Sequence, residues 1–145
     1  MSGITVGIDG SNHSIRALEW AAKEAAVRHA PLTVLTVHLV PRSGWTGNPV
    51  TLPPDLEDVE KERQAAEEMT LKATSQLGEA QPESVTVRAV IGFPSQELIG
   101  ASHEAGLLVV GSRGAGGFAK LVAGSVSSQV VHHAHCPVVV VRSQG

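Results

Sequence analysis

The run Leu107-Leu108-Val109-Val110 is followed at once by Gly111-Ser112-Arg113-Gly114-Ala115-Gly116-Gly117. Unbroken apolar runs of this length are typical of strands in a parallel sheet, where helices cover both faces. A second such run, Val138-Val139-Val140-Val141, lies near the end of the sequence. We therefore expect two parallel strands covered on both faces, joined by a glycine-rich loop and a helix that begins near Ser125.

Towards the start of the chain, expected strands and helices alternate. Strands are expected at residues 4–8, 32–39 and 85–91, and helices at residues 12–29, 56–77 and 95–105. The first helix, for example, is indicated by Ile15, Leu18, Ala22 and Ala25, whose spacing of three and four places them on one face. With right-handed crossovers, this order predicts an α/β fold, a doubly wound five-stranded parallel sheet with helices on both faces, as in Rossmann-like proteins.

Length and charge narrow the functional classes. A chain of 145 residues is expected to form one domain, residues 1–145. A net charge of −3 without a Lys/Arg cluster argues against nucleic acid or an anionic membrane as partner. No apolar run reaches the roughly twenty residues that span a bilayer, and no signal peptide is evident, so we expect a cytoplasmic protein.

Residues 41–54 hold four prolines and are expected to form a surface loop whose role the sequence does not reveal.

The glycine-rich loop is the candidate ligand site. In a doubly wound sheet, ligands bind outside the carboxyl ends of the strands, where the strand order reverses. The glycines after Val110 allow backbone N–H groups to approach an anion, and Gly124-Ser125-Val126-Ser127 adds a helix start with its positive dipole end. Arg113 or Lys120 could supply a cation. We therefore expect the loop from Gly111 to Ser127 to hold the phosphates of a nucleotide.

Three other interpretations of this loop remain to be weighed. A P-loop requires a lysine before the serine, but Ser125 follows Gly124 directly. The segment Gly114-Ala115-Gly116-Gly117-Phe118-Ala119 fits the permissive dinucleotide pattern, yet no acidic residue follows it to hold a ribose. The glycines could also form only a flexible lid, an alternative that composition alone leaves open.

The spacing Gly111-x2-Gly114-x9-Gly124-Ser125 resembles the ATP-binding signature of the universal stress protein family. The resemblance extends to Val6-Gly7-Ile8-Asp9-Gly10-Ser11 near the start and to Cys136-Pro137-Val138-Val139-Val140-Val141 at the end. It implies the ATP-binding branch of the family, with a fold like that of the adenine nucleotide alpha hydrolases. One departure is Gly106, where family members often carry aspartate just before the fourth strand.

The resemblance also implies roles for particular residues. Asp9 would lie beside the nucleoside, Gly7 and Gly10 would let the backbone come close, and Val37 would line the adenine slot. Mg²⁺ or Mn²⁺ would accompany the triphosphate with few direct protein ligands. The full set of expected ATP-binding residues is Gly7, Asp9, Gly10, Ser11, Val37, Gly111, Ser112, Arg113, Gly114, Gly116, Gly117, Gly124, Ser125, Val126 and Ser127.

Two residue groups invite other interpretations. His132, His133, His135 and Cys136 lack a usual zinc-ligand spacing, and we expect neither a metal site nor a nucleophilic cysteine there. Asp9 has an alternative structural role as an N-cap or turn residue ahead of the first helix, and the two roles are compatible.

The function implied by the resemblance is an ATP-binding regulatory switch in the stress response with an unidentified protein partner. A slow ATPase or nucleotidyl-transfer enzyme is an alternative, but no obvious base appears beyond Asp9, so turnover is expected to be slow or absent. A nucleotide-free dimeric scaffold is a further alternative. We expect a homodimer through Val138-Val139-Val140-Val141, because that strand is too apolar to remain an open sheet edge.

Overall fold

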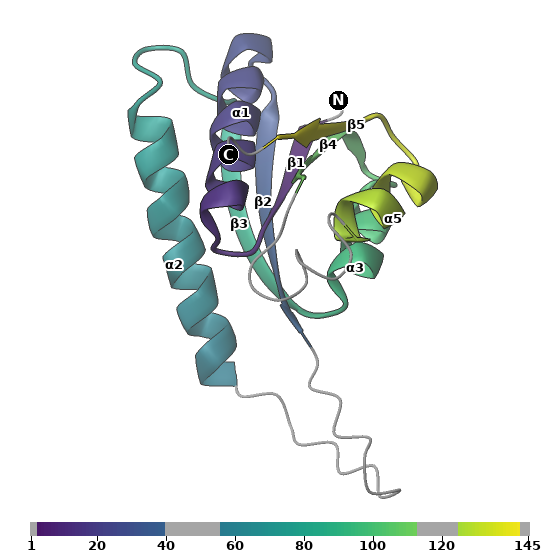
Figure 1. Ribbon diagram of the computed structural model, residues 1–145. Coiled ribbons are helices and arrows are strands. Elements are labelled where there is room, and N and C mark those ends of the chain that lie inside the picture. Colours follow the sequence, from purple (N-terminus) through teal and green to yellow (C-terminus); the bar gives the residue numbers. More distant parts are fainter. Residues whose placement is uncertain (1–2, 40–55, 113–124, 143–145) are drawn as a thin grey trace, which may run out of the picture.

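The computed structural model describes residues 3–39, 56–112 and 125–142. The strands are β1 (Gly3–Ile8), β2 (Pro31–Leu39), β3 (Ser84–Gly92), β4 (Ala105–Gly111) and β5 (Val138–Val141). The helices in these ranges are α1 (Asn12–Arg28), α2 (Leu56–Ser75), α3 (Pro94–Ala101) and α5 (Ser125–His133). All strand pairs are parallel and the strand order is β3-β2-β1-β4-β5 (Figure 1). The predicted fold class is confirmed.

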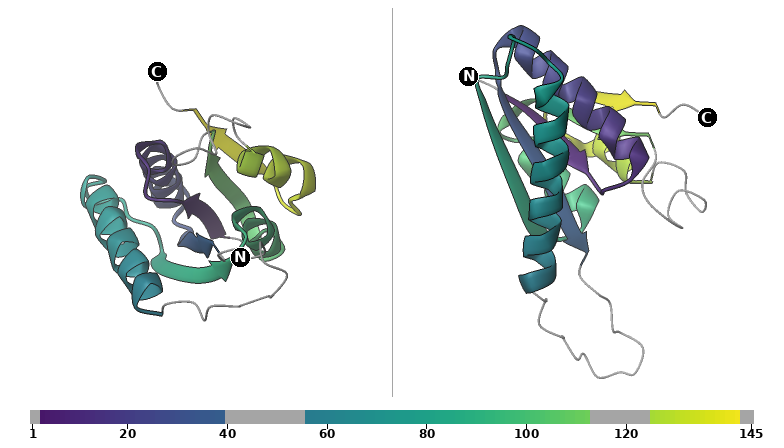
Figure 2. Two further views of the ribbon diagram at one scale, coloured as in Figure 1. Left: turned by 60° about the horizontal axis from the view of Figure 1, so that its bottom comes forward. Right: turned by 90° about the vertical axis from the view of Figure 1, so that its left-hand side faces the viewer.

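The helices earlier in the sequence cover one face of the sheet, and the later helices cover the other face. Figures 1 and 2 show α1 and α2 on one face and α3 and α5 on the other. From β1 the chain moves outward to β2 and β3, and it then returns through α3 to the other side of β1. Because parallel crossovers are right-handed, this reversal of direction moves the helices to the opposite face. The strand order therefore reverses between β1 and β4, and the carboxyl ends of both strands lie at the same edge.

Two apolar clusters fill the space between the sheet and its helices. Leu18 and Ala22 of α1 pack with Ile4 and Val6 of β1 in the first cluster. The second cluster, on the face of α3 and α5, consists of Leu35, Leu98, Leu108, Val110 and Val130. Alanines on the buried side of α1 keep that helix close to the sheet because they add little bulk. The central strands are therefore covered on both faces, as their apolar runs predict.

Three helices end before their predicted last residue. Helix α2 ends at Ser75, two residues before the predicted end. Helix α1 ends at Arg28 because His29 adopts a left-handed conformation with φ of 49°, and its N–H bonds back into the last turn. Helix α3 ends at Ala101, four residues before the predicted end. Ala105 instead belongs to β4, where it pairs with Gly3 of β1.

For the helix expected at residues 56–77, the sequence predicts one apolar stripe made of Leu56, Val59, Ala66, Met69, Ala73 and Leu77. This prediction is wrong at Leu56, which is 71% exposed. Further along, Thr70 and Thr74 are buried although the apolar pattern omits them, since their hydroxyls donate to Ala66 O and Leu71 O at 2.7 and 3.2 Å. Hydroxyls satisfied within the helix can replace apolar side chains at a buried face.

Strand β5 also differs from the expectation of cover on both faces. It lies at the edge of the sheet, and Val140 is 38% exposed.

None of the helices in the three described ranges has both the length and the apolar character needed to cross a bilayer.

The core assignment predicts a contrast between two leucines. Leu18→Ala should lower the free energy of unfolding by roughly 2–5 kcal/mol, because a fully buried leucine leaves a cavity. Leu71→Ala should change it by less than about 0.5 kcal/mol, since Leu71 on α2 is 70% exposed. Urea denaturation followed by circular dichroism measures both. Equal losses in the two variants would contradict the assignment.

Candidate functional site

Strand β1 stops short of β2 at the carboxyl edge of the sheet. The ladder between them ends at the pair of Ile8 with Thr36, whereas β2 continues to pair with β3 as far as Leu39 with Gly92. Within the described ranges, the backbone of residues 37–39 therefore has a ladder partner on the β3 side alone. Peptide N–H and C=O groups without a ladder partner can form hydrogen bonds with a ligand.

On its other side, β1 stops short of β4. The last pair of that ladder joins Val6 to Val109, while β4 continues to Gly111, which pairs with Val141 of β5. The N–H of Ser112 then donates to Val141 O at 2.9 Å and fixes the start of the glycine-rich segment. We call this part of the sheet edge, where β1 ends between residues 37–39 of β2 and Gly111 of β4, the β1 notch.

A tight turn carries the chain from β1 into α1 at this notch. The N–H of Ser11 donates to Asp9 Oδ1 at 2.9 Å, and Gly10 has φ of 85°, a conformation that glycine adopts without strain. Ser11 is the N-cap of α1, with its hydroxyl accepting from the N–H of Ser14 at 3.3 Å. Asp9 is thus an exposed turn residue and Ser11 the cap, so the structural role expected for Asp9 is confirmed as that of a turn. The binding role of Asp9 stays a prediction.

Gly7 has a packing reason to be glycine. A Cβ atom at this position would lie 2.7 Å from Leu98 Cδ2 and 2.9 Å from Leu98 Cδ1. Leu98 belongs to α3 and is 4% exposed, so it has little room to move. The absent side chain lets α3 pack against β1 close to the notch. A direct contact between Gly7 and a nucleotide stays a prediction.

The remaining predicted residues divide into two sets. Val37 is half-buried and packs against the cluster of α3 and α5, at the β2 side of the notch. Gly111 and Ser112 lie at the end of β4, and Val126 and Ser127 lie in the first turn of α5, where Ser127 is buried. Arg113, Gly114, Gly116, Gly117 and Gly124 lie outside the described residues. Of Ser125, the structure describes only its place as the first residue of α5.

Helix α3 begins at Pro94, one residue before the predicted start at residue 95, with proline at the first helical position. Sequence reasoning missed one contact near the notch. On the other face of the sheet, His38 Nδ1 lies 2.9 Å from Glu62 Oε1 of α2. No sequence pattern links two residues 24 positions apart.

The histidines and the cysteine near the end of α5 do not converge on one point. His135 stacks on His103 with ring centroids 3.7 Å apart, while the rings of His132 and His133 are 6.4 Å apart. Across the described ranges, no three His, Cys, Asp or Glu side chains gather as metal ligands. Burial raises the pKa of the Cys136 thiol, although a backbone hydrogen bond from Leu108 acts in the opposite direction. The thiol therefore favours its unreactive protonated form.

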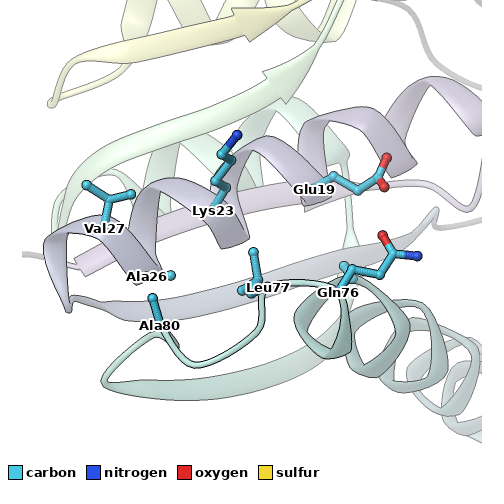
Figure 3. Close-up of a pocket in the computed structure, with 8 residues that line it drawn as sticks. Glu19, Lys23, Ala26, Val27, Gln76, Leu77 and Ala80 are labelled. Atoms are coloured by element: carbon cyan, nitrogen blue, oxygen red, sulfur yellow. The ribbon is translucent and has the colours of Figure 1, made fainter.

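A surface hollow of about 400 Å³ lies between α1 and α2 (Figure 3). Its walls are Glu19, Lys23, Ala26, Val27, Ala73, Gln76, Leu77 and Ala80. These residues come from the second half of α1 and from the end of α2 and the turn beyond it, so the hollow is remote from the carboxyl ends of the strands. It is not the predicted nucleotide site.

Residues 1–142 match the Universal stress protein family. Universal stress protein Rv2005c of Mycobacterium tuberculosis is 36% identical over 143 residues, which cover 97% of this chain and 48% of that protein. The chain thus spans about half the length of the curated relatives it matches. A solved universal stress protein in complex with cAMP has a TM-score of 0.70 at 26% identity, covering 99% of this chain and 98% of its own. The universal stress protein from Archaeoglobus fulgidus in complex with dAMP has a TM-score of 0.60 at 25% identity, covering 97% of each chain.

The contact between Gly7 and Leu98 predicts coupled substitutions. Gly7→Ala should lower the free energy of unfolding by roughly 1–3 kcal/mol, because the added methyl group overpacks a filled space. In the double variant Gly7→Ala/Leu98→Ala, the loss should be smaller than the sum of the two single losses, since the shortened side chain makes room. Chemical denaturation of the three variants measures this coupling.

Gly100→Ala is the matched control. Outside its own helix backbone and chain neighbours, no atom of the described residues lies within 4 Å of a Cβ at Gly100 on α3, so alanine there should stabilise the helix by roughly 0.5–1 kcal/mol. Strictly additive losses in the Gly7 and Leu98 variants would show that the two residues do not share the space assigned to them.

Proposed function

Because the chain belongs to the universal stress protein family, we propose that it is an ATP-binding regulatory protein of the cytoplasmic stress response. In this proposal the nucleotide state controls binding of a protein partner or of a second copy. The observation that carries it is the β1 notch, where Asp9 and Gly111 lie at one edge of the sheet and the sequence has the spacing that resembles the family's ATP-binding signature. The relatives in complex with cAMP and dAMP support an adenine nucleotide as the ligand class.

The notch has the chemistry that each part of ATP requires. The base would lie against the open backbone of residues 37–39, with the side chain of Val37 providing an apolar wall. Asp9 would accept hydrogen bonds from the ribose hydroxyls. The phosphates would lie between the glycine segment after Val110 and the first turn of α5, whose N-terminal dipole end favours anions. Mg²⁺ or Mn²⁺ would offset the charge of the triphosphate.

Helix α5 connects the proposed phosphate site to the sheet edge. It begins at Ser125, and the segment after it leads into β5. That segment is fixed by two hydrogen bonds: His135 N–H donates to Ser102 Oγ at 2.9 Å, and Leu108 N–H donates to Pro137 O at 3.0 Å. A change at the start of α5 would therefore reach the edge strand through packed and bonded elements. This route supports a regulatory role in which ATP affects what pairs with β5.

Binding of Mg-ATP is the primary test. The protein should bind ATP in isothermal titration calorimetry, and Asp9→Ala should weaken binding about tenfold or more, because a charged acceptor is lost. Asp9→Asn separates the two roles of this residue, since its amide oxygen can keep the bond to the Ser11 N–H without the charge. Asp58→Ala, in the exposed first turn of α2, is the control that should leave the affinity unchanged.

Absence of binding heat with magnesium present would contradict the proposal and favour a nucleotide-free scaffold. A single-turnover assay with labelled ATP separates the switch from an enzyme. We expect no product within seconds. Rapid product formation that Gly111→Ala or Gly124→Ala removes would instead identify an ATPase or transferase.

The edge strand predicts the assembly state. β5 has a strand neighbour only on its β4 side within the described ranges, and its four valines would pair with a second copy. We expect light scattering at micromolar concentration to give about twice the 15.1 kDa mass of one chain. Val140→Lys should shift the mass to that of the monomer, because a charge on an edge strand opposes pairing.

The control for this prediction is Val131→Lys, which adds the same charge at a 52% exposed position on α5. It should leave the dimer intact. A wild-type monomer, or dimers that both lysine variants retain, would argue against pairing through β5.

A further inference from the structure

His38 links the end of β2 to α2. Successive side chains of a strand point to opposite faces, so Val37 lies on the face of α3 and α5, whereas His38 lies on the face of α1 and α2. His38 Nδ1 is 2.9 Å from Glu62 Oε1, and the histidine side chain is 23% exposed. An imidazole with hydrogen on Nδ1 donates to the carboxylate here, and both the neutral Nδ1–H tautomer and the protonated ring provide that hydrogen. We call this contact the His38–Glu62 tie.

The tie joins two segments that otherwise have limited support. No side chain between residues 56 and 65 of α2 is buried, and the buried stripe begins only at Ala66. Arg63, next to Glu62, bonds to Glu60 and Glu67 at 2.6 and 2.8 Å, so these ion pairs act within the helix. The Arg63 guanidinium accordingly lowers the pKa of Glu60. The hydrogen bond between His38 and Glu62 ties this part of α2 to the sheet.

The other oxygen of Glu62 has no hydrogen-bond partner in the described part of the molecule, although that atom is buried. An unpaired buried acceptor lowers stability by roughly 1–3 kcal/mol. Glu62 is therefore not expected to stabilise the fold strongly. Its role is better explained by its hydrogen bond to His38. His38 belongs to the three residues of β2 that extend past the end of β1, where a ladder on one side alone holds the backbone.

We propose that His38 and Glu62 are positioning residues for base recognition in the β1 notch. By holding His38 against α2, the tie fixes the backbone of residues 37–39 at the place where the base of a nucleotide would bind. This inference rests on the proposed nucleotide function and deepens it, since it assigns the choice of base to a hydrogen bond on the opposite face of the sheet.

The order of donors and acceptors explains how backbone position could select a base. Adenine presents an amine donor beside a ring-nitrogen acceptor, whereas guanine presents a carbonyl acceptor beside a ring N–H donor. A peptide edge held in one position offers N–H and C=O groups in a fixed order and so favours one of the two bases. If the backbone of residues 37–39 shifts, the protein loses its discrimination between adenine and guanine before it loses its contacts to the phosphates.

The test compares ATP with GTP on the full chain by calorimetry with magnesium present. Glu62→Ala should weaken ATP binding about three- to tenfold, the effect of one hydrogen bond, and leave GTP binding within about twofold. The ratio of the two affinities is the decisive readout, because a general loss of structure would weaken both nucleotides alike. Glu62→Gln keeps an oxygen acceptor for His38 and should restore the wild-type ratio.

Variants of His38 and a control complete the design. His38→Leu should match Glu62→Ala, and the double variant His38→Leu/Glu62→Ala should show no additional loss, as expected for one shared contact. Glu68→Ala, on the exposed face of the same helix, should keep the wild-type ratio. If either single variant fails to fold, the other together with Glu62→Gln still decides the question.

The outcomes separate this inference from the function on which it rests. A wild-type protein that binds neither nucleotide refutes the proposed function. A wild-type protein that binds ATP and GTP equally, or variants that keep the wild-type preference for ATP, refute the positioning role while leaving nucleotide binding intact. A lowered ratio in Glu62→Ala and His38→Leu, restored by Glu62→Gln, supports it.

Discussion

The pairing of β1 with β2 on one side and β4 on the other is the contact on which the rest of the structure depends. It places the first strand at the centre of the sheet, so Val6 is fully buried beneath α1. Because β1 is also shorter than its neighbours at the carboxyl edge, the same pairing creates the notch. Core and candidate site thus depend on the same strand pairing, and the turn through Asp9 and Gly10 leads the chain out of the sheet where β1 ends.

The two faces of the sheet serve this edge in different ways. On the face of α3 and α5, Leu98 fills the space that Gly7 leaves, and α5 runs from the proposed phosphate site towards the edge strand. On the face of α1 and α2, the contact from His38 to Glu62 joins the end of β2 to α2. In the proposed complex a ligand in the notch contacts neither Leu98 nor Glu62 directly, and both residues would instead position the backbone around it.

Much of the fold could be predicted because its signals are local. The apolar run of β5 gave the observed bounds, and the spacing of Leu18, Ala22 and Ala25 gave the buried face of α1. The errors arose where long-range contacts override such patterns: edge position leaves Val140 exposed, and pairing with Gly3 draws Ala105 into β4. In the site, the turn at Asp9 and the end of β4 were predictable from strand ends. The contacts of His38 with Glu62 and of Gly7 with Leu98 were not, since only the folded chain brings those residues together.

The strand order has a consequence for how the protein is made. Strands β1, β2 and β3 are neighbours in the sheet in the order of their synthesis, so each can pair soon after it leaves the ribosome. The other edge of β1 has to wait for β4, which begins about a hundred residues later at Ala105. During that interval the apolar centre of the future sheet is an unpaired edge. The nascent chain is therefore most prone to aggregate before the strand that completes the notch has been synthesised.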